Sequence, residues 1–168
     1  PMKDHPNFLA AISKVTVDLP EVKSVCVGGG VGAYAENLIR DLRPENESCP
    51  TVWVGVRTDI PDCLNALDLL VSSSYGEGFP NVIAEAMACG KICVVTDVGD
   101  CATIVGSCGI VTPPRDSGAI ASAIVSVKNK PSDEIDRLAS EGRARIVDQF
   151  SISALVDNTE SLLVDLCD

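Results

Sequence analysis

Short apolar runs alternate, along the first two thirds of the chain, with segments whose apolar residues recur at helical spacing. The runs end in glycine, serine or a charged residue and predict strands at 24–30, 51–56, 68–74, 91–96 and 109–112. The segments between them predict helices at about 33–42, 60–66, 80–89 and 100–105. Because strands that alternate with helices pair in parallel through right-handed crossovers, the pattern predicts an α/β fold with a mostly parallel sheet.

The last third of the chain has a different pattern, in which three amphipathic helices follow one another without a strand. Their apolar positions fall at 120–127, 135–150 and 155–166. Ser132 and Ser151 are candidate N-cap residues for the second and third helix. We therefore expect three consecutive helices at the C-terminal end.

The composition is that of one domain whose sheet is covered by helices on both faces. The 168 residues are 46% apolar but only 4% aromatic, which favours a core of Val, Ile, Leu and Ala. The formal net charge of −11 argues against non-specific binding to nucleic acid or to anionic lipid. A bound anion would therefore need a locally positive site.

The cysteines and the apolar segments indicate where the chain works. Eight cysteines occur singly, without a Cys-x-x-Cys pair, and are interpreted as buried, reduced thiols rather than zinc ligands. No apolar stretch has the length of a membrane span, and the N-terminus lacks a signal pattern. These features indicate a soluble, cytoplasmic chain.

The stretch GEGFPNVIAEAMACG, residues 76–90, predicts a helix that faces a ligand site. Pro80 suits the first turn of a helix, and Gly90 suits the left-handed position just past its end, so the helix spans about 80–89. Ligands of open α/β sheets bind at the carboxyl ends of the strands, where the helix N-termini attract phosphate. An acidic chain could hold an anion there.

Two acids flank this helix N-terminus. Glu77 precedes the helix and Glu85 lies within it, so both could border one crevice and accept hydrogen bonds from hydroxyl groups. A phosphate that carries sugar rings, as in a nucleotide sugar, would use this set of groups. The alternative is that Glu77 is an ordinary turn residue and Glu85 a solvated helix residue.

The pattern E-G-F-P-N-V-x-x-E-A-M-A-C-G resembles the signature of the group 1 (family 4) retaining glycosyltransferases, in the C-terminal, donor-binding domain of their GT-B fold. The likeness extends along the chain through PMKDHPNFLAA, VGGG, GVRTDIP, DLLVSSSYGEGFPNV, VVTDVGD, GIVTPPRD and RIVDQFS. It implies that residues 1–168 form one Rossmann-like, three-layer domain that binds a nucleotide sugar. UDP-sugars are the family's commonest donors and GDP-sugars the next.

The resemblance also implies roles for particular residues. Glu85 would bind the ribose hydroxyls, and Glu77 would face the donor sugar near the reacting centre. Lys3 would neutralise the diphosphate, unless it is a frayed terminal residue, and Arg57 would border the base. Backbone contacts to sugar and diphosphate would come from Gly78, Phe79, Pro80, Asn81 and Val82.

No metal or further cofactor is expected. The chain has no Asp-x-Asp sequence, and its single histidine, His5, is interpreted as a surface or helix-start residue. A weaker interpretation takes GGGVGA, residues 28–33, as a dinucleotide-binding turn. The next strand ends in Val-Arg rather than in the acid that would hold the ribose of NAD.

Complete enzymes of this family also carry an N-terminal acceptor domain and a first strand that would precede Lys3. We therefore expect a partial enzyme that binds donor but transfers little sugar alone; the alternative is a non-catalytic nucleotide-sugar-binding or partner module. We further expect residues 24–28 to pair with 68–72, or to accept a strand from another chain such as a second copy. The residues leave the base, the sugar and the acceptor open.

Overall fold

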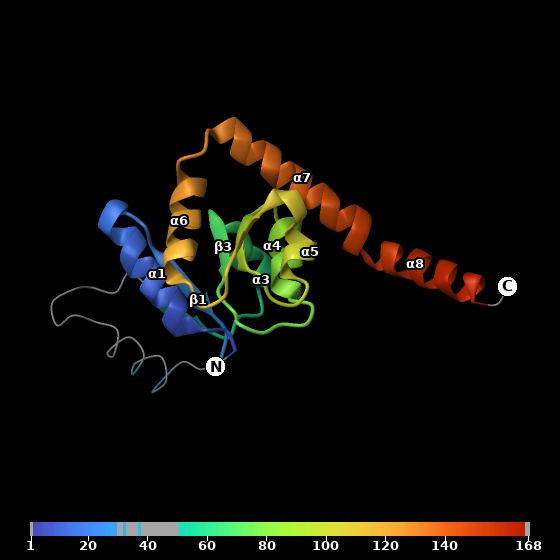
Figure 1. Cartoon of the computed structure of the whole chain (residues 1–168), viewed down its shortest axis with the longest axis horizontal. Coiled ribbons are helices and arrows are strands. Elements are labelled where there is room, and N and C mark those ends of the chain that lie inside the picture. The colour runs from blue at the N-terminus through green and yellow to red at the C-terminus, as the bar shows by residue number, and fades with distance from the viewer. Residues whose placement is uncertain (1, 30–31, 33–36, 38–50, 167–168) are drawn as a thin grey trace.

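The computed structural model describes residues 2–29, 32, 37 and 51–166 (Figure 1). Its elements in chain order are α1 (His5–Asp18), β1 (Ser24–Val27), β2 (Thr51–Gly55), α3 (Ile60–Asn65), β3 (Leu69–Ser72), α4 (Asn81–Ala88), β4 (Ile92–Thr96), α5 (Cys101–Val105), the 3-10 turn η1 (Gly106–Cys108), β5 (Ile110–Thr112), α6 (Ser117–Lys128), α7 (Ser132–Phe150) and α8 (Ile152–Asp165). All five predicted strands are present. The predicted helix at 33–42 lies, apart from residue 37, outside the described residues.

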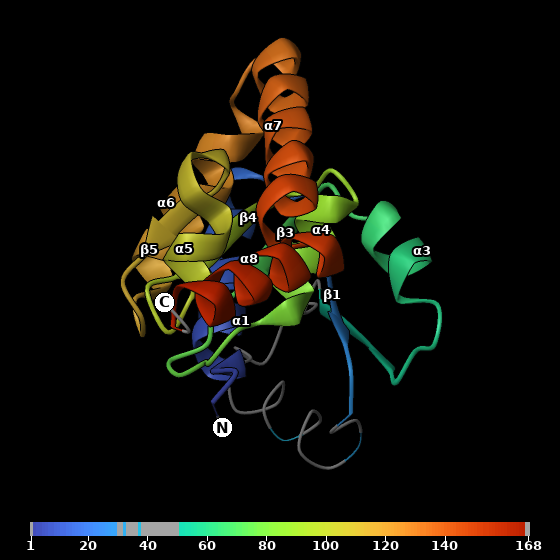
Figure 2. The same ribbon diagram turned by 90° about the vertical axis from the view of Figure 1, so that its right-hand side faces the viewer.

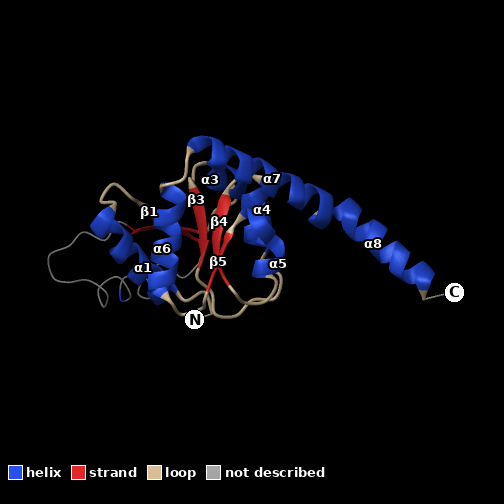
Figure 3. Ribbon diagram, turned by 45° about the horizontal axis from the view of Figure 1, so that its top comes forward, coloured by secondary structure: helices blue, strands red, loops and turns tan. Residues whose placement is uncertain are grey.

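A parallel sheet in the order β3-β4-β5 forms the centre of the molecule, with helices on both sides (Figure 3). Every residue of β4 is buried. Because successive side chains of a strand point to opposite faces, Ile92 and Val94 pack with α1 and α6, while Cys93 and Val95 pack with α4, α5 and α7. The predicted α/β, Rossmann-like, three-layer fold is confirmed.

The strands β1 and β2 form a separate parallel pair. Within the described residues, no ladder joins β1 to β3, so the expectation that residues 24–28 pair directly with 68–72 is wrong. Strand β1 pairs along one edge with β2 instead, with Val25 opposite Val52. The other option, a strand supplied by another chain, stays a prediction.

Helix α1 is missing from the elements that the sequence pattern predicted. Its buried residues Phe8, Leu9, Ile12 and Val15 have helical spacing and would have revealed it. His5 is its first residue, as one interpretation of that histidine held, and its ring lies edge-on to Trp53 with centroids 4.9 Å apart. Burial of His5 against β2 lowers the pKa of its imidazole.

The three consecutive C-terminal helices are confirmed as α6, α7 and α8. Ser151 caps α8 by accepting a hydrogen bond from the Ala154 amide at 3.2 Å. Ser132 does not cap α7, because Pro131 is the N-cap residue and Ser132 the first helical one. Helix α6 is well buried, whereas α8 contains no buried residue and leads away from the sheets (Figures 1 and 2).

The cysteine interpretation holds for the thiols at the centre of the fold. Cys93, Cys101 and Cys108 are buried, and burial raises the pKa of Cys93 to about 12, so this thiol stays protonated. Cys49 and Cys167 lie outside the described residues. In the described part of the chain, no helix is long and apolar enough to cross a membrane.

Candidate functional site

The loops that follow β3, β4 and β5 meet at the carboxyl ends of these strands. The Asp100 amide donates to the Gly78 carbonyl at 3.0 Å, and the Asp97 amide donates to the Thr112 carbonyl at 2.8 Å. Gly99 has a φ of +51°, and a Cβ placed there would lie only 2.4 Å from the Glu77 carbonyl oxygen. Backbone bonds therefore hold the loop that carries Glu77 and Gly78 against its neighbours.

A carboxylate and an ammonium group face each other in this region. The Lys3 Nζ donates to the Glu77 Oε1 at 2.6 Å, and the Ser74 hydroxyl donates to the same oxygen at 2.6 Å. The Glu77 side chain is 12% exposed, whereas that of Lys3 is 58% exposed. The carboxylate is thus fixed from within the protein, and the ammonium group reaches solvent.

Lys3 is held in place by its backbone as well as by its side chain. The Ser73 hydroxyl donates to the Lys3 carbonyl at 2.8 Å, and the Tyr75 amide donates to the Met2 carbonyl at 3.0 Å. Ser73 and Ser74 are both buried. These bonds attach residues 2–4 to the loop after β3, so Lys3 is not a frayed terminal residue.

The pKa of Glu77 reflects two opposing influences. Burial alone would raise it, but the hydrogen bonds from Lys3 and Ser74 and the positive charge of Lys3 lower it below its ordinary value. The carboxylate therefore stays ionised and can accept further hydrogen bonds from a ligand.

The N-terminus of α4 lies directly after this loop. Pro80 is the N-cap residue rather than the first helical residue, and its carbonyl accepts from the Ile83 amide at 3.0 Å. The amides of Asn81 and Val82 precede the first residue that can find an intrahelical acceptor, and both residues are exposed. Gly90, with a φ of +69°, ends the helix as predicted. An anion could reach these amides and the positive end of the helix dipole.

The predicted site residues are only partly brought into contact. Lys3 and Glu77 are joined, and the buried Pro80 and the exposed Phe79 connect them to α4; the Phe79 ring packs on that of Phe150 at 5.8 Å. Glu85 is exposed on α4. Arg57 follows β2 and pairs with Asp59 at 2.5 Å. In the described part of the chain, neither Glu85 nor Arg57 bonds to another predicted site residue.

Three further residues at these carboxyl ends were not predicted. The Arg115 guanidinium, in the loop after β5, lies 4.5 Å from the centre of the Tyr75 ring, in the loop after β3. The pair joins segments far apart in the sequence, so no local pattern could have revealed it. Ser74, which orients Glu77, was likewise missed, although its place within the serine run at 72–74 was visible.

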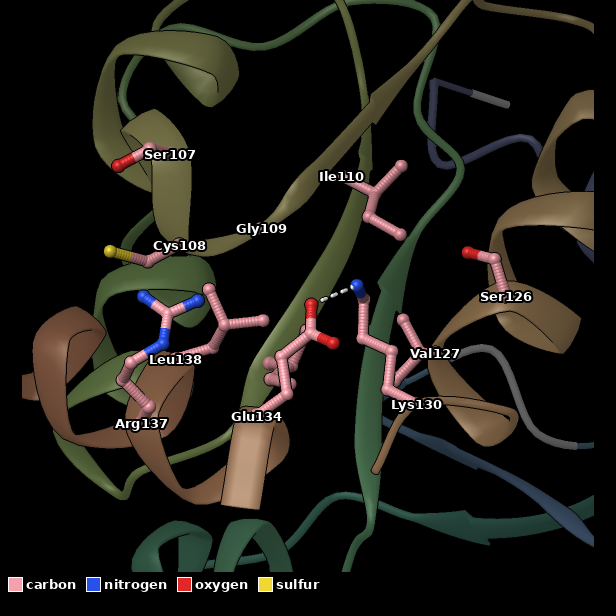
Figure 4. Close-up of a pocket in the computed structure, with 11 residues that line it drawn as sticks. Ser107, Cys108, Gly109, Ile110, Ser126, Val127, Lys130, Glu134, Arg137 and Leu138 are labelled. Carbon is pink, nitrogen blue, oxygen red and sulfur yellow. Dashed lines mark hydrogen bonds and ion pairs between the residues drawn. The ribbon is translucent and has the colours of Figure 1, made fainter. Parts of the chain in front are cut away.

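A cavity of about 330 Å³ lies elsewhere, at the amino ends of β4 and β5 (Figure 4). Ile92 and Ile110, the first residues of these strands, line it, and Lys130 and Glu134 point toward one another across it. None of the predicted site residues lines this cavity. Among the residues that the structure describes, no three His, Cys, Asp or Glu side chains gather as metal ligands.

The family model of the glycosyl transferases group 1 matches residues 1–130 of the chain. The chain belongs to this family. One curated relative is the UDP-Gal:alpha-D-GlcNAc-diphosphoundecaprenol alpha-1,3-galactosyltransferase of Escherichia coli, which is 28% identical over 96% of this chain and 42% of that protein. Another is the lipopolysaccharide core biosynthesis mannosyltransferase LpsB of Rhizobium meliloti, which is 37% identical over 79% of this chain and 40% of that protein. The chain thus spans less than half the length of these relatives.

Solved structures agree with this assignment. HepE from Anabaena, in complex with UDP and glucose, superposes with a TM-score of 0.81 at 28% identity, over 98% of this chain and 46% of that one. The fold is therefore that of GT-B glycosyltransferases, and this chain corresponds to less than half of the HepE chain.

Proposed function

We propose that this chain is the donor-binding half of a retaining glycosyltransferase and that it binds a nucleotide-diphosphate sugar at the carboxyl ends of β3, β4 and β5. The observation that carries the proposal is the Lys3–Glu77 pair, fixed by Ser74 directly before the N-terminus of α4. The structural similarity to HepE, solved in complex with UDP and glucose, supports UDP as the nucleotide.

In this proposal, the positive charge at the diphosphate comes from the protein. The free amides at the start of α4 would donate to phosphate oxygens, and the exposed Lys3 ammonium would reach the same group. When the bond to the sugar breaks, negative charge grows on the departing phosphate, and donors already fixed in place stabilise it most. We propose no metal ion in this step, so UDP should bind equally well in EDTA and in Mg²⁺.

The acids and the remaining residues would orient the donor. Within the described residues, both hydrogen bonds to Glu77 fall on Oε1, so its other oxygen could accept from a sugar hydroxyl. Glu85 would accept from the ribose hydroxyls, and Arg57 would border the base. The backbone of 78–82 would approach the sugar and the diphosphate.

The share of its relatives' length that the chain spans supports a proposal about what it does alone. Because it spans less than half of each, we propose that it binds donor but transfers little or no sugar without an acceptor domain. A non-catalytic partner module would bind in the same way and differ only in transfer. Sugar transfer by the purified chain, measured with and without candidate acceptor domains, distinguishes these roles; robust transfer by the chain alone would contradict the first.

The donor site is tested by calorimetric titration with UDP, GDP, ADP and NADH. We expect UDP to bind with micromolar to millimolar affinity and Glu85→Ala to weaken it by about tenfold or more, as loss of a charged hydrogen bond does. Glu160→Ala, which removes an exposed glutamate of α8, is the matched control and should leave affinity unchanged. Tight binding of NADH without binding of UDP would refute the proposal.

A further inference from the structure

Arg115 has a backbone that suits glycine and a side chain that reaches toward the candidate site. Its φ of +60° lies in the left-handed region, which is unfavourable for a long side chain. Gly99, in the neighbouring loop after β4, adopts a similar φ of +51° without that cost. The fold therefore holds an arginine in a backbone conformation that glycine would adopt without strain.

Within the described residues, the N–H groups of the Arg115 guanidinium donate no hydrogen bond. In the described part of the chain, its interaction is the contact with the Tyr75 ring, at 4.5 Å from the ring centre. The other described arginines each donate to a carboxylate or carbonyl oxygen; they are Arg57, Arg137, Arg143 and Arg145. A ring contact orients the planar guanidinium but satisfies none of its N–H groups.

Tyr75 connects this arginine to the Lys3–Glu77 pair. The Tyr75 amide bonds to the Met2 carbonyl, and its neighbour Ser74 bonds to Glu77, so Arg115 is anchored to the segment that fixes Lys3. The carboxyl ends of the strands also carry exposed acids, among them Asp97 and Asp100. The Lys3 charge is shared with Glu77, so a second cation beside it would strengthen the binding of an anion here.

We propose that Arg115, braced by Tyr75, binds a phosphate group of the ligand at the carboxyl ends of β3, β4 and β5. This rests on the proposed function, and we assign the phosphate to the donor's diphosphate; a phosphate on the acceptor has the same chemistry and is the alternative source. The planar fork of arginine suits two phosphate oxygens at once.

The decisive variant is Arg115→Gly, because glycine fits the observed φ and should not lower the melting temperature. We expect it to weaken UDP and inorganic pyrophosphate by about tenfold, in calorimetric titrations, and to leave the weak binding of uridine unchanged. Tyr75→Leu removes the ring brace and should weaken UDP by a few-fold. Arg137→Ala, at the cavity of Figure 4, removes an arginine already bonded to Glu141 and should change nothing.

Titration of glycerol phosphate into the chain saturated with UDP distinguishes a phosphate of the donor from a phosphate of the acceptor. If Arg115→Gly leaves UDP unchanged but abolishes binding of glycerol phosphate, the arginine serves the acceptor side. If the wild type binds pyrophosphate through Arg115 but not UDP, the proposed function fails and the phosphate site stands. If Arg115→Gly alters neither UDP, pyrophosphate nor glycerol phosphate binding, the inference is overturned.

Discussion

The two sheets of this protein are built from similar valine-rich strands but differ in how they are covered. In the three-stranded sheet, Val94 of β4 is 0% exposed, because helices pack on both of its faces. In the β1-β2 pair, Val25 is 42% and Val52 57% exposed. The hydrophobicity of a strand therefore does not decide its burial; the layers around it do.

The loops that follow the strands of the two sheets also differ, in how firmly hydrogen bonds hold them. Those after β3, β4 and β5 are bonded to one another and to residues 2–4. After β2, the ion pair of Arg57 with Asp59 is local and exposed. A ligand site needs groups that stay fixed when the ligand arrives, so the difference favours the three-stranded sheet as the place of donor binding.

The largest difference in stability is expected between alanine substitutions of two glycines, Gly99 beside the three-stranded sheet and Gly28 beside the β1-β2 pair. A Cβ at Gly99 would meet the backbone oxygens of Glu77 and Gly78 at 2.4 and 2.5 Å, whereas one at Gly28 would meet no atom of the described residues within 4 Å. Both have positive φ, so both alanine variants carry backbone strain. Gly99→Ala should lower the unfolding free energy by about 3 kcal/mol or more, and Gly28→Ala by about 1 kcal/mol.

Urea unfolding measures both glycine variants, and UDP titration shows whether the Glu77 loop has moved. We expect Gly99→Ala to lose UDP binding and Gly28→Ala to retain it. Equal destabilisation by the two substitutions would show that the loops after β3 and β4 are not packed as described.

The second test exchanges one valine in each sheet for alanine. Val94→Ala removes two buried methyl groups and leaves a cavity between two helical layers, which should cost about 2 kcal/mol of unfolding free energy. Val52→Ala acts at a largely exposed position and should cost about 0.5 kcal/mol or less. If urea unfolding gave similar losses for both, the β1-β2 pair would be as well covered in solution as the central sheet.

The sequence predicted what local spacing encodes. Pro80 and Gly90 placed α4 within one residue at each end, and the order of strands and helices predicted the parallel pairing. The three layers were implied by the family resemblance. The separation of the sheets could not be predicted in this way, because the pairing of β1 depends on distant segments. The family resemblance singled out Lys3 and Glu77 separately, whereas their ion pair and the contact of Arg115 with Tyr75 are formed only by the folded chain.

The smallest change in stability is expected from breaking the ion pairs Lys3–Glu77 and Arg57–Asp59, and it should depend on pH. The pKa of Glu77 is lowered from the ordinary 4.5, so its contribution to stability is present above pH 4.5 and is lost as the pH falls through the lowered pKa. Glu77→Gln should cost about 0.5 kcal/mol at neutral pH, and this difference from the wild type should shrink below pH 4.5. Urea unfolding from pH 3 to pH 7 follows both proteins.

The matched control is Asp59→Asn, which breaks the exposed pair after β2. The hydrogen bond from Arg57 lowers the pKa of Asp59 from 3.8, so its contribution disappears only as the pH falls below that value. Salt screens exposed charges more than buried ones, and Glu77 is 12% exposed where Asp59 is 38% exposed. High salt should therefore erase the effect of Asp59→Asn and preserve most of that of Glu77→Gln. If high salt reduced the destabilisation by Glu77→Gln as much as that by Asp59→Asn, Glu77 would be hydrated like a surface carboxylate. The fixed Lys3–Glu77 pair that supports donor binding, with its carboxylate shielded from solvent, would then be contradicted.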